Sequence, residues 1–64
     1  MASKEVHHGG FHVTVHQEGK ERWADLPACR LENDCELVDL QELLAIILPF
    51  LDGDGTFEDL PGVV

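Results

Sequence analysis

Apolar and polar residues alternate along the segment that begins at Phe11, and this alternation constrains the fold more than any other feature of the chain. An apolar residue occupies every second position from Phe11 to Val15, which is typical of a β-strand with one buried face. The Glu18-Gly19 pair that follows predicts a two-residue turn, because Gly supplies the positive φ that such turns need. We therefore expect a β-hairpin over residues 11–26.

The turn also predicts a register for this hairpin. With Gln17 opposite Lys20, the face that points to the core collects Phe11, Val13, Val15, Ala24 and Leu26. The other face then pairs His16 with Glu21, Thr14 with Trp23, and His12 with Asp25.

A helix is expected next. Asn33, followed three residues later by Glu36, matches a capping box, so we expect a helix from about Asp34 to Leu48, ended by Pro49. One face of this helix carries an acidic stripe of Glu36, Asp39 and Glu42. The predicted buried stripe contains Leu37, Leu40, Leu44 and Ile47. Every residue from Leu43 to Leu48 is apolar, so this end is expected to lie in the core or under a partner.

The chain has 64 residues, and a chain of this length forms one small domain. We expect a flexible N-terminal arm over residues 1–10 and a single small α+β domain over residues 11–64. In this domain an antiparallel β-hairpin packs on one α-helix, and a short third strand through Cys29 and Leu31 is an open alternative. The small size argues against an enclosed catalytic pocket, so we expect no enzyme and assign no catalytic residue.

The cysteine and histidine spacings do not predict a metal site. Cys29 and Cys35 are spaced C-x5-C, which is not a zinc-binding pattern, and we expect free thiols with a disulfide as the alternative. His12 and His16 are about 13 Å apart along a strand, too far to share an ion. We therefore expect no metal and no cofactor. Calcium at the acidic Asp52–Asp59 segment remains a less favoured alternative.

We also expect a cytoplasmic, soluble protein. The first ten residues are polar, so they do not resemble a secretory leader. The longest apolar stretch, Leu43 to Leu51, is shorter than the roughly 20 residues that cross a membrane.

The net charge of −9 lies entirely in the second half of the chain. Residues 1–30 hold four acids and four bases, whereas residues 31–64 hold nine acids and no base. Such a field repels nucleic acids and anionic membranes and attracts basic protein surfaces. The predicted partner-binding residues are Glu32, Asp34, Glu36, Asp39, Glu42 and the single Trp23.

Our first hypothesis is a small acidic inhibitor or regulator that binds a basic protein surface, such as that of a nucleic-acid-binding protein. In its strongest form the chain is a nucleic-acid mimic, in the manner of anti-CRISPR proteins carried by phages. The order strand, turn, strand, Leu26 to Cys29, then helix resembles HicB-type antitoxins. That resemblance implies the alternative of an antitoxin or a homodimeric assembly module that binds through the apolar end of its helix.

Overall fold

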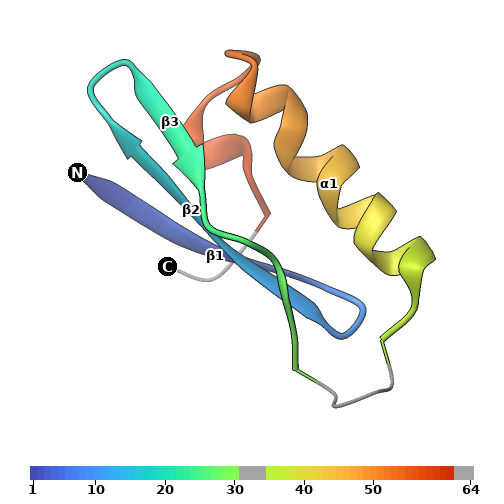
Figure 1. Cartoon of the computed structure of the whole chain (residues 1–64). Helices are drawn as coiled ribbons and strands as arrows, with labels where there is room; N and C mark the ends of the chain where they lie inside the picture. Colours follow the sequence, from blue (N-terminus) through green and yellow to red (C-terminus); the bar gives the residue numbers. More distant parts are fainter. Residues whose placement is uncertain (31–34, 62–64) are drawn as a thin grey trace.

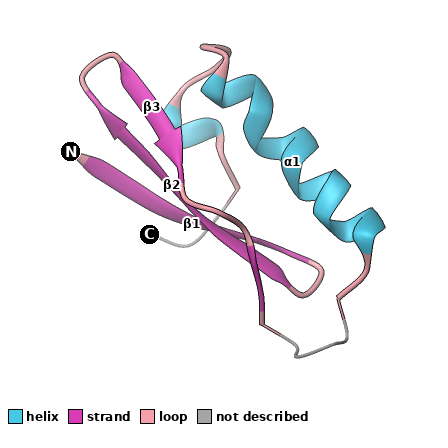
Figure 2. Cartoon of the chain, viewed as in Figure 1, coloured by secondary structure: helices cyan, strands magenta, loops and turns pink. Residues whose placement is uncertain are grey.

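A four-stranded antiparallel sheet packs with one face against a single helix in this computed structural model, which describes residues 1–30 and 35–61 (Figure 1). The strands are β1 (Ala2–His8), β2 (Phe11–Glu18), β3 (Glu21–Ala24) and β4 (Ala28–Cys29). Helix α1 (Leu37–Leu51) and the short 3₁₀ helix η1 (Phe57–Asp59) follow the sheet in the chain (Figure 2). The predicted small α+β class with an antiparallel hairpin is confirmed.

The predicted flexible arm is instead a strand. β1 pairs with the full length of β2, from Ala2 opposite Gln17 to His8 opposite Phe11. Only Lys4 and Val6 of this strand are buried, so no apolar alternation marks β1 in the sequence. Gly9, with a φ of 59°, takes the first position of the two-residue turn to β2.

The predicted register between β2 and β3 is wrong by two positions. Gln17 lies opposite Arg22 rather than Lys20, because the loop is Gly19-Lys20 with Gly19 at a φ of 59°. The predicted pairs of His16 with Glu21, of Thr14 with Trp23 and of His12 with Asp25 are therefore wrong, and His16 lies opposite Trp23 instead. A shift of two positions keeps side chains on their predicted faces, since their directions alternate along a strand. Val13 and Val15 are buried, and Phe11 and Ala24 pack against them, as predicted.

Leu26, the fifth residue predicted to face the core, is instead 91% exposed. Val15 pairs with Ala24, while His12 pairs with Ala28. Three residues (25–27) thus oppose two on β2, which is the definition of a β-bulge and turns Leu26 outward. The short third strand left open as an alternative is present beyond the bulge as β4, although Leu31 lies outside the described residues.

Both ends of α1 differ from the prediction. Helix α1 begins at Leu37, and its N-cap residue Glu36 makes no capping hydrogen bond with its side chain. The predicted capping box and the predicted start at Asp34 are therefore wrong. Asn33 and Asp34 themselves lie outside the described residues. At the other end the helix passes Pro49 and ends at Leu51. Proline has no backbone N–H, so Pro49 cannot donate the helical hydrogen bond to the carbonyl oxygen of Ala45. Both residues are exposed. Because water can reach this side of α1, the lost bond is tolerated.

The core lies between α1 and the inner face of the sheet. Its buried apolar residues are Val6, Val13, Val15, Leu43, Ile47, Phe50 and Leu60. Ile47 lies inside this core and Leu44 packs partly against it, as predicted. Leu40 is only half-buried and does not belong to this core, and Leu37 is 68% exposed, so the predicted buried stripe holds only in its second half. No helix in the described parts of the chain is long and apolar enough to cross a membrane.

A disulfide joins Cys29 of β4 to Cys35, two residues before α1, so the expectation of free thiols is wrong. The sequence places the two cysteines only six positions apart. The bond therefore closes the connection between the last strand and the helix.

Candidate protein-binding surface

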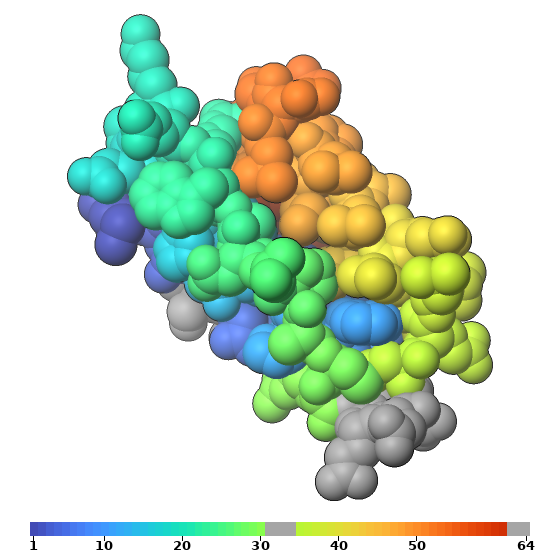
Figure 3. Space-filling model, viewed as in Figure 1, coloured from blue at the N-terminus to red at the C-terminus, as the bar shows by residue number. Residues whose placement is uncertain are grey.

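The side of α1 that points away from the sheet is apolar. The exposed fractions of Leu37, Val38 and Leu48 are 68%, 51% and 52%, and Ala45 and Pro49 are exposed as well. At 3.6 residues per turn these five residues fall on one side of the helix, and we call them the outer stripe. Figure 3 shows α1, in yellow to orange, along one flank of the molecule.

The composition of α1 explains this arrangement. Only Asp39, Gln41 and Glu42 are polar among its fifteen residues, so the helix cannot be apolar toward the core and polar toward water. Gln41 is exposed and lies on the same side of α1 as the outer stripe, between Val38 and Ala45. Exposed apolar residues that gather in a patch are typical of an interaction surface.

Exposed carboxylates lie around the outer stripe. Glu36 precedes α1, Asp52 and Asp54 follow it, and Glu42 borders the stripe on one side. A negative helix C-terminus is not favoured by the helix dipole, so Asp52 and Asp54 are not placed there to stabilise α1.

The two most enclosed bases do not neutralise these acids. Arg22 donates hydrogen bonds to the carbonyl oxygens of Phe50 at 2.9 Å and Gly55 at 3.1 Å, and its guanidinium carbon lies 4.2 Å from the centre of the Phe50 ring. Lys4 likewise donates to backbone carbonyl oxygens near the C-terminus. Within residues 1–30 and 35–61, each of the four close contacts between a carboxylate and a basic side chain involves a histidine rather than Lys or Arg. Lys and Arg therefore do not neutralise the excess of carboxylates, and the surface stays negatively charged.

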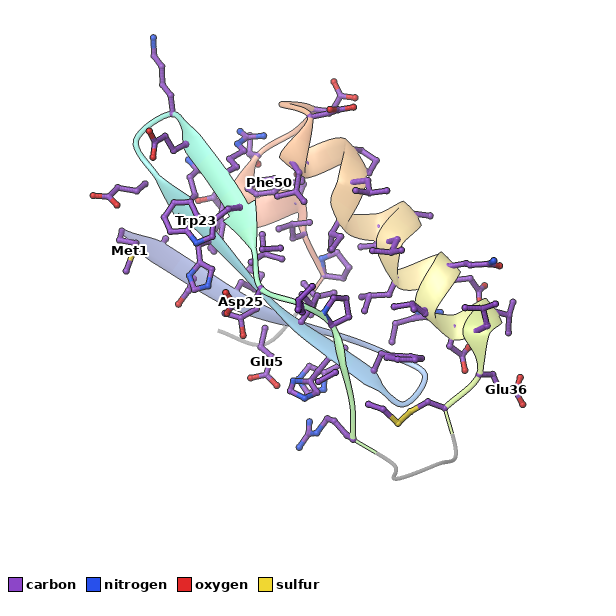
Figure 4. The ribbon with its side chains drawn as sticks, viewed as in Figure 1. Met1, Glu5, Trp23, Asp25, Glu36 and Phe50 are labelled. Carbon is purple, nitrogen blue, oxygen red and sulfur yellow. A yellow bond between two sulfur atoms is a disulfide. The ribbon has the colours of Figure 1, made fainter. Side chains whose placement is uncertain are left out.

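The predicted partner-binding residues do not form one surface. Glu32 and Asp34 lie outside the described residues. Glu36 is exposed at the start of α1 (Figure 4), but Asp39 and Glu42 lie beside the β1–β2 turn. Trp23 belongs to the opposite face of the sheet, as its position on β3 beside His16 shows. The acidic stripe is thus divided between the helix surface and the turn.

The face of the sheet away from α1 is polar and rich in histidine. His16 stacks on Trp23 with ring centroids 5.3 Å apart, and its Nε2 lies 3.2 Å from Oδ2 of Asp25. Figure 4 shows Trp23 on the side of β3 away from α1, whereas Phe50 extends between helix and sheet. Trp23 is 37% exposed because the His16 ring covers one of its faces.

His8 is a residue of interest that the sequence did not reveal. Its Nε2 lies 3.3 Å from Oε1 of Glu42, which is 34 positions later in the chain. His8 and Asp39 are half-buried, and Glu42 is exposed. No spacing pattern in the sequence marks such a contact, because it forms only when the β1–β2 turn packs against α1.

One carboxylate of the acidic segment after α1, that of Asp59, has a structural role. Oδ2 of Asp59 accepts a hydrogen bond from the backbone N–H of Thr56 at 3.0 Å, and the two residues form a capping box on η1. In the described parts of the chain, the acids of this segment are not among the groups whose ligand atoms converge.

No protein-family model matches the chain, and no curated protein and no solved structure is significantly similar to it. The likeness to HicB-type antitoxins consequently remains one of element order.

Proposed function

We propose that this chain is a small acidic protein-binding regulator that contacts a basic surface of another protein through the outer side of α1. One observation carries the proposal: the outer stripe is exposed and apolar, and the carboxylates around it have no Lys or Arg partner among the described residues. Neither core packing nor helix stability requires that combination.

The two parts of this surface have different tasks. Carboxylates attract a basic partner from a distance and raise the rate of encounter, while desolvated apolar contacts supply most of the affinity. The partner is expected to present an apolar patch with Lys and Arg at its rim. Where those Lys and Arg residues normally hold phosphates, the bound chain blocks nucleic acid, which is the nucleic-acid-mimic form of the proposal.

The test measures binding to a partner isolated from the source cells at low and at high salt, with a chelator present throughout. One variant carries Glu36→Gln and Asp52→Asn beside the outer stripe. Its matched control carries Glu5→Gln and Asp25→Asn on the opposite face of the sheet, so both lose two negative charges. The first variant should bind more weakly, with the loss largest at low salt, and the control should bind nearly as the wild type. Equal losses in both would reject the α1 surface.

A second candidate is a homodimeric assembly module, and the exposed outer stripe also favours it. In that case the stripe of one copy packs on that of another. Salt separates the two candidates, since two chains of charge −9 repel each other and should associate better when salt screens them. Binding to a basic partner should respond in the opposite sense. Sedimentation at two salt concentrations measures the self-association directly.

A further inference from the structure

Three side chains with metal-binding atoms converge where the β1–β2 turn meets α1. One imidazole nitrogen of His8 and one carboxylate oxygen each of Asp39 and Glu42 all lie within 4.8 Å of one another. They are the only such group of three or more in the described ranges 1–30 and 35–61. Of these three residues, only Glu42 also borders the outer stripe.

Local structure explains why these groups meet. Asp39 and Glu42 are three positions apart on α1, so their side chains lie next to each other on the helix surface. His8 ends β1 with its side chain on the α1 side of the sheet. The following Gly9 packs so closely that a Cβ placed on it would lie 2.5 Å from Cγ of Asp39. The turn and the helix are thus held together at the cluster, by a glycine that leaves room for the carboxylate.

We propose that His8, Asp39 and Glu42 bind a divalent transition-metal ion of the zinc class. One imidazole nitrogen and two carboxylate oxygens suit such ions, whereas Ca²⁺ and Mg²⁺ prefer oxygen ligands alone. Three protein ligands leave one position of a tetrahedral zinc ion for water, and the exposed Glu42 lies on the side open to solvent.

The bound ion would join two elements that are far apart in the chain. His8 belongs to the first strand, and Asp39 and Glu42 belong to the first half of α1. Small domains often depend on a metal or a disulfide because their cores are small. Here the Cys29–Cys35 disulfide already ties the strand side of the connection to the start of α1. The ion would add a second link near the same end of the helix and neutralise two carboxylates of the acidic stripe.

The test is a titration of the metal-free protein with Zn²⁺, competed against a chromophoric chelator and followed by NMR of the histidine rings. One equivalent of Zn²⁺ should shift the His8 ring and raise the thermal unfolding midpoint. The substitutions His8→Ala, Asp39→Asn and Glu42→Gln should each weaken binding by roughly tenfold or more. Because Glu42 is exposed, Glu42→Gln tests the site even if another variant fails to fold.

Two controls make the result specific. His12→Asn removes an imidazole from the opposite face of the sheet, and Glu36→Gln removes an acid just before α1. Both should retain wild-type affinity for Zn²⁺. The proposal is overturned if Glu42→Gln binds Zn²⁺ as tightly as the wild type. It is also overturned if Zn²⁺ shifts the His7 and His12 rings in place of His8, or if no binding occurs at equimolar Zn²⁺. Partner binding is measured with chelator present, so either proposal can fail without the other.

Discussion

The ammonium nitrogen of Lys4 lies 3.0 Å from the carbonyl oxygen of Leu60, which is 56 positions away in the chain. The same nitrogen donates to the carbonyl oxygen of Phe57 at 2.9 Å and lies 4.9 Å from the centre of the Phe57 ring. Lys4 is only 7% exposed, so a cation of the first strand holds the segment after α1 in place. Backbone carbonyl oxygens and an aromatic ring, rather than a carboxylate, stabilise its charge.

Replacing Lys4 with Met should therefore destabilise the protein. Met keeps much of the side-chain volume but leaves two carbonyl oxygens without their donor, which costs about 1–3 kcal/mol. Urea unfolding measures the change. Lys20→Met, at the exposed tip of the β2–β3 loop, is the matched control and should change the free energy of unfolding by less than about 0.5 kcal/mol. Equal effects of the two substitutions would contradict the role of Lys4.

The two turn glycines provide a second comparison. Gly9 and Gly19 share a φ of 59°, so Ala at either position costs about 1–2 kcal/mol of backbone strain. Ala at Gly9 also places a Cβ 2.5 Å from Asp39, whereas nothing lies within 4 Å of a Cβ at Gly19. Gly9→Ala should thus lower the thermal midpoint more than Gly19→Ala does. Identical midpoints would show that the turn does not pack on α1.

The core and outer sides of α1 should respond differently to truncation. Leu43 is fully buried, and Leu43→Ala should cost about 2–5 kcal/mol because it leaves a cavity. Leu48 is 52% exposed on the outer stripe, so Leu48→Ala should cost less than about 1 kcal/mol while weakening partner binding or self-association. Denaturant unfolding gives the first quantity and a binding assay the second. A large loss of stability in Leu48→Ala would show that the outer stripe is not free.

The disulfide should make a measurable contribution to stability. Loop-closure entropy for cysteines six positions apart amounts to about 2 kcal/mol. The Cys29→Ser, Cys35→Ser double variant should lose about that much in chemical denaturation, and a reducing agent should have no effect on it. An unchanged free energy of unfolding after reduction of the wild type would mean that the bond adds no constraint to the unfolded chain.

Local patterns determined which face most side chains of the hairpin take. The alternation from Phe11 to Val15 fixed the inward residues correctly even though the predicted register was two positions off, since period two survives such a shift. It failed at Leu26, where a bulge adds one residue and reverses the direction of the side chain. The apolar run of α1 likewise indicated a helix that the core could not cover completely.

The sequence by itself thus determined the α+β class, the hairpin and the approximate place of the helix, all of which depend on short-range periodicity. Tertiary structure decided the rest. β1 has a buried lysine at a position where an apolar residue would have completed the alternation of a strand. That lysine donates to carbonyl oxygens more than fifty positions away. The contact of His8 with Asp39 and Glu42 likewise joins residues that are far apart in the chain. Such contacts follow from how the sheet and helix pack, and a local pattern carries no information about partners that distant.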